Sequence, residues 1–212
     1  MAPQNLSRFV AFALVITISL ALFPTSAYAD SVGNNNNNPY PLTSLASFAK
    51  SVTDGEDAVT GVFVDYLFAL SVVQQPTKNF EFISSSDKVV TQFNLAAEYK
   101  NIGLLAHDYL AGKYFSQLTD GQSVYLVHGT GRVEAFSVTQ IYQYQALDPN
   151  NPSSNFKDLG TERIYTAQQV FQLMYMGGHH LTFQTCIEKN GNLSWGRLFV
   201  VAEPISATPT IH

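Results

Sequence analysis

Cysteine is almost missing from this chain of 212 residues, because Cys186 is its only example. A single cysteine excludes a disulfide bond within the chain, so a folded domain has to rely on its hydrophobic core. In an exported protein, such a thiol indicates either an intermolecular bridge or a reactive group. A buried cysteine that only packs as a small hydrophobic side chain is the alternative to both.

Basic residues are also few. The chain has 11 Lys and Arg against 16 Asp and Glu, which gives a net charge of −5. Domains that bind nucleic acids carry clustered Lys and Arg, and the sequence has no such cluster, so a nucleic-acid partner is not expected. Aromatic residues are plentiful, with 15 Phe and 11 Tyr. This composition favours a β-rich domain.

Long apolar runs are missing except at the N-terminus. Arg8 precedes the apolar run 9–23, and Ala27-Tyr28-Ala29 has the A-x-A form of a signal-peptide cleavage site. The run is shorter than the roughly 20 residues of a typical membrane-spanning helix. Residues 1–29 are therefore predicted to be a secretory signal peptide, which places the mature chain outside the cell or at its surface. An uncleaved membrane anchor is the alternative.

The rest of the chain divides by composition. Residues 30–46 contain a run of asparagines flanked by Gly and Pro, and this segment is predicted to be a flexible linker. Residues 47–205 are long enough to form one domain with its own core. Residues 206–212 form a short tail.

Alternation of apolar and polar residues is the main structural signal in the domain. Between Val62 and Val72, apolar side chains recur at alternate positions, which predicts a strand or a pair of strands. The other predicted strands are short and lie at 80–83, 89–95, 102–106, 123–127 and 133–144. A short helix is predicted at 44–50, a loop with a helical turn at 108–118, and a long loop at 147–160. Thr166-Ala167-Gln168-Gln169 has the form of a capping box, which predicts a helix from 166 to 176. Many short strands with few helices predict a barrel or a sandwich.

The last two strands surround Asn190-Gly191, a dipeptide typical of a two-residue hairpin turn. With that turn and no bulge, Cys186 faces Trp195 and Gln184 faces Arg197. Cys186 and Arg197 then project from the same face of the sheet as diagonal neighbours, about 7–8 Å apart.

A thiol beside a cation suits nucleophilic chemistry. The cation favours the thiolate and can stabilise the oxyanion of an acyl-transfer transition state. A third group has to move the protons, and His107 is the best placed of the five histidines because it ends an apolar strand and precedes a loop. His179 and His180 are adjacent, but no third metal ligand accompanies them, so no metal site is predicted.

Three segments carrying these residues resemble one protein family. The segments are IGLLAHDYLAGKYFSQLTDGQSVYLV, LTFQTC and WGRLFVVAEP. Together they resemble the bacterial sortases, cysteine transpeptidases that attach surface proteins to the cell wall. His107, Cys186 and Arg197 fall on the histidine, cysteine and arginine of the family. The chain departs from the usual pattern at Ala106, where the family has Gly, and at Phe183, where it has Leu.

The resemblance implies a fold and an activity. The implied fold is mainly β, an eight-stranded barrel with one or two short helices. The implied catalytic residues are Cys186, His107 and Arg197, while Thr185 and Trp195 are candidates for substrate contact, with strand packing as their alternative. No cofactor is implied, and metal dependence is left open.

The implied substrates are surface proteins that carry an LPxTG-like sorting signal, and the implied acceptor is a peptidoglycan-precursor or pilin amine. A sortase-fold thiol hydrolase and a non-catalytic surface-binding module are the alternatives.

Overall fold

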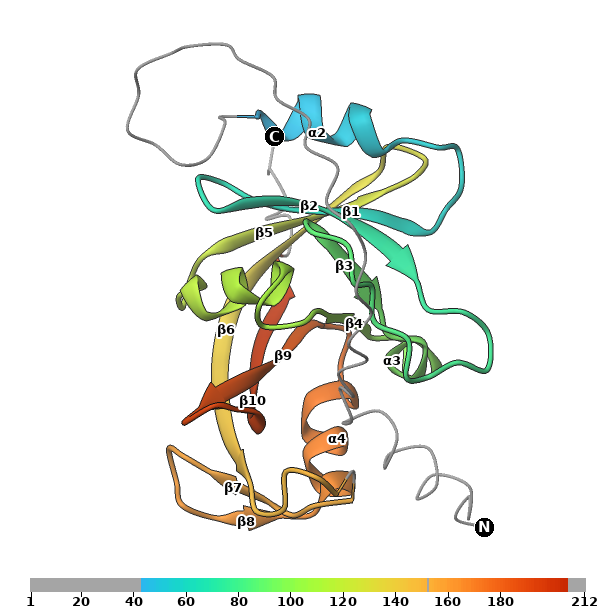
Figure 1. The fold of residues 1–212 in the computed structure, drawn as a ribbon. Helices are drawn as coiled ribbons and strands as arrows, with labels where there is room; N and C mark the ends of the chain where they lie inside the picture. The colour runs from blue at the N-terminus through green and yellow to red at the C-terminus, as the bar shows by residue number, and fades with distance from the viewer. Residues whose placement is uncertain (1–42, 152, 206–212) are drawn as a thin grey trace.

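The computed structural model describes residues 43–151 and 153–205 (Figure 1). The predicted signal peptide, residues 30–42 of the predicted linker and the predicted tail lie outside the described residues. Helix α2, Leu45–Val52, begins inside the range predicted as linker. Ser44 caps this helix, because its side chain accepts a hydrogen bond from the backbone N–H of Ser47 at 3.2 Å.

Eight strands close into a barrel. In spatial order they run β10, β9, β4, β3, β2, β1, β5 and β6, and the pairing of β10 with β6 closes the ring. The bounds are β1 Val59–Val64, β2 Phe68–Gln74, β3 Val89–Gln92, β4 Ile102–Leu105, β5 Ser123–His128, β6 Val133–Ala146, β9 Leu181–Lys189 and β10 Asn192–Pro204. The short strands β7, Phe156–Asp158, and β8, Ile164–Tyr165, extend the sheet beyond β6. The prediction of an eight-stranded barrel is confirmed.

The barrel interior is filled by every second side chain of its strands. All eight strands contribute to one buried apolar cluster, which includes Val62, Leu70, Val90, Leu104, Leu126, Phe136, Phe183 and Leu198. A second apolar cluster covers the outer face of β4, β6 and β10, beneath helices α3, Asn94–Glu98, and α4, Ala167–Tyr175 (Figure 1). A third lies under α2, outside β1 and β5. Alternation therefore decides which side chains of a strand face inward and which face the outer layer.

Of the helices in the described residues, α3 is the one that no sequence pattern predicted. Within the described residues there are α2, α3, α4 and the 3₁₀ helix η1, Ala111–Gln117. The helix predicted over 166–176 is confirmed as α4, and its capping box is present: Thr166 and Gln169 each bond the other's backbone N–H. The helical turn predicted after His107 is η1.

Two sequence-based strand predictions need correction. Residues 80–83 form a turn followed by irregular chain, and the carbonyl groups of Phe80 and Phe82 accept hydrogen bonds from the side-chain amide of Gln75 instead of from a neighbouring strand. The strand predicted over 89–95 ends at Gln92, and the chain enters α3 at Asn94. The predicted loop 147–160 also contains the short strand β7.

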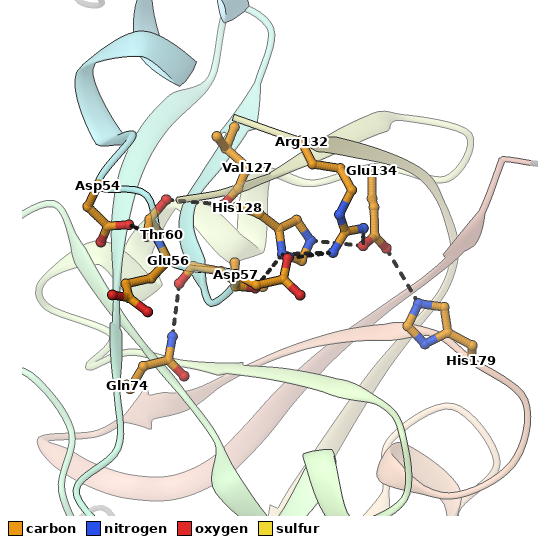
Figure 2. Close-up of polar contacts among 11 residues, drawn as sticks. Asp54, Glu56, Asp57, Thr60, Gln74, Val127, His128, Arg132, Glu134 and His179 are labelled. Atoms are coloured by element: carbon orange, nitrogen blue, oxygen red, sulfur yellow. Dashed lines mark hydrogen bonds and ion pairs between the residues drawn. The ribbon is translucent and has the colours of Figure 1, made fainter. Parts of the chain in front are cut away.

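A cluster of charged and imidazole groups ties the β5–β6 hairpin to the segment before β9 (Figure 2). Glu134 lies at its centre. One carboxylate oxygen accepts a hydrogen bond from Nε2 of His128 at 2.8 Å and another from Arg132. The second oxygen lies 3.6 Å from Nε2 of His179. Burial alone would raise the pKa of Glu134, but Arg132 and His128 outweigh it, so its pKa lies below the ordinary value.

Glu134→Gln is expected to destabilise the domain at neutral pH by about 1.5–3 kcal/mol, the usual range for hydrogen bonds to a charged group. Because the folded-state pKa of Glu134 is depressed, its contribution is full above the unfolded pKa of about 4.3 and is lost as the pH falls through the folded value. Urea unfolding at several pH values measures both effects. Glu162→Gln is the control, because Glu162 pairs with Lys157 at the surface, and this variant should unfold much like the wild type. Equal losses in the two variants would contradict the role given to the cluster.

Candidate active site

The hairpin that carries the thiol contains a bulge that the sequence did not reveal. Asn190 and Gly191 form the predicted turn, with positive φ values of 54° and 78°, and Asn192 pairs with Lys189. The next pair is Gly196 with Ile187, so three residues of β10 lie opposite one residue of β9. The predicted pairings of Cys186 with Trp195 and of Gln184 with Arg197 are therefore wrong.

Arg197 instead pairs directly with Cys186. The bulge adds two residues, and an even number leaves the alternation of faces unchanged. The prediction that the two side chains share a face survives for this reason, and they are closer than predicted, at the roughly 4.5–5.5 Å between Cα atoms of direct partners.

The shared face is the outer face of the barrel wall. Phe183 and Leu198 belong to the interior cluster, and Phe199, two residues beyond Arg197, belongs to the outer cluster. Cys186 and Arg197 alternate with the interior residues, so they face outward, yet both are buried, with 5% and 4% of their surfaces exposed.

His107 follows β4, which pairs in parallel with β9 on the side opposite β10. Leu105 of β4 pairs with Gln184 of β9, and the backbone N–H of Ala106 donates to the Gln184 carbonyl at 3.2 Å. Continued residue by residue, this register brings His107 level with Cys186. Arg197 is therefore the direct strand partner of Cys186, and His107 lies just beyond the end of β4, the other strand that pairs with β9.

The backbone at His107 is held firmly. Its carbonyl accepts hydrogen bonds from the N–H groups of Leu110 and Gly112, at 3.0 and 2.9 Å. The imidazole stacks on the ring of Tyr109, with 5.2 Å between the centroids. Within the described part of the chain, Nδ1 of His107 is buried and has no hydrogen-bond partner. An unsatisfied buried nitrogen of this kind is costly in a resting protein and suits a group that exchanges protons.

Thr185 makes an internal contact. Its hydroxyl donates to the carbonyl of Ala106 at 2.9 Å, and 2% of the residue is exposed. Gly112 packs against it so closely that a Cβ there would lie 2.2 Å from the Thr185 hydroxyl oxygen. Thr185 directly precedes Cys186, and Ala106 directly precedes His107. The hydrogen bond between them therefore ties the two segments that carry the thiol and the imidazole. The predicted contact of Thr185 with substrate stays a prediction.

Thr185→Val is expected to leave the Ala106 carbonyl without its donor, to cost about 1–3 kcal/mol of stability, and to slow alkylation of the Cys186 thiol in the folded state. Thr182→Val is the matched control, because the Thr182 hydroxyl donates to the Met174 carbonyl at 2.7 Å, away from the thiol. Urea unfolding and alkylation rates measure the two effects. Equal alkylation rates in Thr185→Val and Thr182→Val would contradict the role of Thr185 in positioning Cys186.

Trp195 lies within the bulge rather than opposite the thiol. The ammonium group of Lys189 lies 4.5 Å from the centre of its indole ring, a cation–π contact that fixes the tryptophan at the end of the hairpin. Its predicted role in substrate contact likewise stays a prediction.

The electrostatics of the site favour the neutral forms of both reacting groups. Burial raises the pKa of the Cys186 thiol, Arg197 opposes this rise, and Asp108 adds to it. Burial lowers the pKa of His107, with Asp108 and the backbone of Ile83 opposing. At neutral pH the resting site therefore holds mainly a thiol and a neutral imidazole, and the cation of Arg197 is what favours the thiolate.

Two neighbours of the site were not singled out in the sequence. Tyr144 of β6 pairs with Arg197 on the side away from Cys186 and is 1% exposed. The register between β6 and β10 joins residues about fifty positions apart, and no local pattern encodes it. Asp108 directly follows His107 and is half-buried; its position in the sequence was a signal that could have been used.

No group of three or more His, Cys, Asp or Glu side chains in residues 43–151 and 153–205 is arranged to hold a metal ion. In the same residues, no helix has the length and apolar character that a membrane span requires.

No protein-family model matches the chain, and no curated protein matches it in sequence. Solved structures of sortases match it in fold. Sortase C of Clostridium perfringens SM101 is 15% identical, with a TM-score of 0.42 and 73% of each chain covered. Sortase A of Corynebacterium diphtheriae is 14% identical, with a TM-score of 0.46 over 74% of this chain and 65% of that one. A sortase D5 transpeptidase of Clostridium perfringens is 12% identical, with a TM-score of 0.45 over 77% and 90%. In fold, the chain is similar to sortases.

Proposed function

We propose that this chain is a sortase-type cysteine transpeptidase. It would cleave an LPxTG-like sorting signal and transfer the acyl group to a peptidoglycan-precursor or pilin amine. The observation that supports the proposal is that Arg197 is the direct cross-strand partner of Cys186, while β4, which ends two residues before His107, pairs with β9 on its other side in a register that leads toward Cys186. A nucleophile, a cation and a proton-transfer group are the three parts that acyl transfer through a thioester requires.

The first half of the reaction forms the thioester. Cys186 acts as the thiolate, with its proton on His107, and Sγ attacks the carbonyl carbon of the Thr-Gly bond. Negative charge develops on the carbonyl oxygen, where Arg197 stabilises it. His107 then donates its proton to the departing Gly amine, the C–N bond breaks, and a thioacyl enzyme remains.

The second half releases the product. The acceptor amine attacks the thioester carbonyl and transfers a proton to His107, the new C–N bond forms, and the C–S bond breaks. The Cys186 sulfur leaves as a thiolate and recovers the proton from His107. Attack by water in place of the amine gives a free acid, so the same site would also support the thiol-hydrolase alternative.

Incubation of the full chain with a library of sorting-signal peptides and an amine acceptor tests the proposal. Amide products, absent with Cys186→Ala, are expected. Free acids in every reaction would indicate a thiol hydrolase. A Cys186 thiol that resists methanethiosulfonate until the protein is denatured, together with no turnover, would indicate a non-catalytic surface-binding module.

The same proposal places the chain outside the cell or at its surface, where sorting-signal proteins and their acceptors meet. Whether residues 9–23 are removed or retained as an anchor is tested by N-terminal sequencing of the protein recovered from expressing cells. A chain that begins at Asp30 is the expected result.

A further inference from the structure

The bulge of β10 has an ordered structure of its own. Leu193, Ser194 and Trp195 are the three residues opposite Glu188. The side chain of Asn192 accepts a hydrogen bond from the backbone N–H of Ser194 at 3.0 Å. This bond forms a small Asx-type turn within the strand, and such turns fix the direction of the following peptide groups.

The carbonyl groups of the bulge bind Arg197. Nη1 of Arg197 donates to the Gly196 carbonyl at 2.8 Å and to the Ser194 carbonyl at 3.2 Å. A guanidinium group on a long side chain samples many rotamers unless it is held. Here two carbonyl groups of its own strand hold one nitrogen, and the rest of the side chain lies buried beside Cys186.

Gly196 allows the bulge to pack against the barrel. A Cβ at this position would lie 2.4 Å from the backbone carbonyl oxygen of Tyr144 on β6. No real Cβ contact is that short, so any side chain here would push β10 away from β6. The close packing of the two strands keeps the bulge, and therefore its carbonyl groups, in one place.

We propose that the bulge of β10 is a positioning element for Arg197, in which the Ser194 and Gly196 carbonyl groups, ordered by Asn192, fix the guanidinium beside Cys186. This inference rests on the proposed acyl-transfer function, because the fixed cation would meet the oxyanion that forms at the thioester carbon. Bulges recur next to active sites, where they redirect a side chain. Ser194, Gly196 and Asn192 act through Arg197 and touch no reacting atom.

The register suggests a direct test. Deleting Ser194 and Trp195 gives a regular hairpin in which Leu193 pairs with Glu188 and Arg197 still pairs with Cys186. The deletion removes the Ser194 carbonyl, one of the two groups that clamp the Arg197 guanidinium, and keeps both the Gly196 carbonyl and the pairing of Arg197 with Cys186. With the full chain, kcat for amide formation is expected to fall about 10- to 100-fold, the range for a misplaced catalytic group, with a smaller change in KM. The pH profile of Cys186 alkylation is expected to move to higher pH, because Arg197 lowers the pKa of the thiol.

A double-mutant cycle shows whether the effect passes through Arg197. In an Arg197→Gln background, the deletion should add little further loss of kcat, because the group that it misplaces is already gone. The same loss in both backgrounds would show that the bulge acts in another way and would overturn the inference.

Asn192→Ala provides a milder second variant, which decides the matter if the deletion does not fold. It removes the bond to the Ser194 N–H at an exposed position, so a several-fold loss of kcat and a smaller shift of the alkylation profile are expected. Asn192→Asp should restore both, since a carboxylate oxygen can accept the same bond. Asn151→Ala is the matched control, because Asn151 makes an equivalent bond to the Ser153 N–H at 2.9 Å in a distant loop.

The pH profile of Cys186 alkylation distinguishes a failure of the proposed Arg197 clamp from a failure of the proposed acyl-transfer function. If no sorting peptide is turned over, the proposed function fails, but a shifted profile in the deletion variant still supports the clamp. An unshifted profile in both Asn192→Ala and a folded deletion variant overturns the clamp, whether or not the wild type transfers acyl groups.

Discussion

Replacing Arg197 with glutamine is expected to lower kcat/KM for amide formation about 10²- to 10³-fold, the range for removal of one oxyanion-stabilising group. Arg197 is buried and is the direct partner of Cys186, so its charge acts at short range and with little screening by water. The loss should fall mainly on kcat, because the oxyanion exists only in the transition state. The same variant should alkylate at higher pH, since Arg197 favours the thiolate of Cys186.

Arg163→Gln is the control for this prediction. Arg163 is exposed and follows the short turn after β7, so its replacement removes the same charge from the chain without touching the thiol. Thermal unfolding of both variants shows whether the Arg197→Gln protein is folded. A folded Arg197→Gln variant with wild-type kcat/KM would exclude Arg197 from the chemistry.

Replacing His107 with glutamine is expected to lower kcat/KM about 10²- to 10⁴-fold, the contribution typical of general acid–base catalysis. The wild type should show a bell-shaped pH dependence. Its acid limb lies below the ordinary histidine pKa of about 6.5 and its alkaline limb above the ordinary cysteine pKa of about 8.5, because burial lowers the pKa of His107 and raises that of Cys186. The active form holds one proton between the two groups, so losing it at high pH or adding a second at low pH stops the reaction.

In the His107→Gln variant, the acid limb that His107 sets should be lost and replaced by a single rise at higher pH. The remaining rate should rise with pH, as the fraction of thiolate rises, up to the pKa of Cys186. Kinetics over pH 5–10 measure this, and His179→Gln is the control because its side chain is 46% exposed and lies next to Glu134. An unchanged acid limb in His107→Gln would assign the titration to another group.

Local patterns in the sequence predicted much of the barrel. The alternation between Val62 and Val72 predicted a strand or a pair of strands, Asn190-Gly191 predicted the last turn, and Thr166 with Gln169 predicted the start of α4. Each of these depends on residues close together in the chain. The segment 80–83 misled for a related reason: its apolar alternation is that of a strand, but within the described residues it pairs with no strand, and Gln75 donates hydrogen bonds to the carbonyl groups of Phe80 and Phe82.

The candidate site depends on contacts between distant segments, and these were less predictable. The parallel pairing of β4 with β9, which brings His107 to Cys186, joins residues almost eighty positions apart. Its prediction rested on resemblance to sortases, because no turn or period encodes such a pairing. Cys186 and Arg197 lie close together in the sequence, yet the bulge between them shifted their pairing by two residues. The shared face was predicted correctly because that shift is even.

The central claim is that Cys186 forms a thioester with a sorting-signal peptide. Mixing the full chain with an LPxTG-like peptide, quenching in acid within seconds and mapping the adduct by peptide mass spectrometry tests it directly. An acyl adduct on Cys186 that ends at the peptide's Thr, is lost with an added amine and is absent in Cys186→Ala is the predicted result. Full peptide consumption with no adduct on Cys186, or turnover that persists in Cys186→Ala, would contradict the claim.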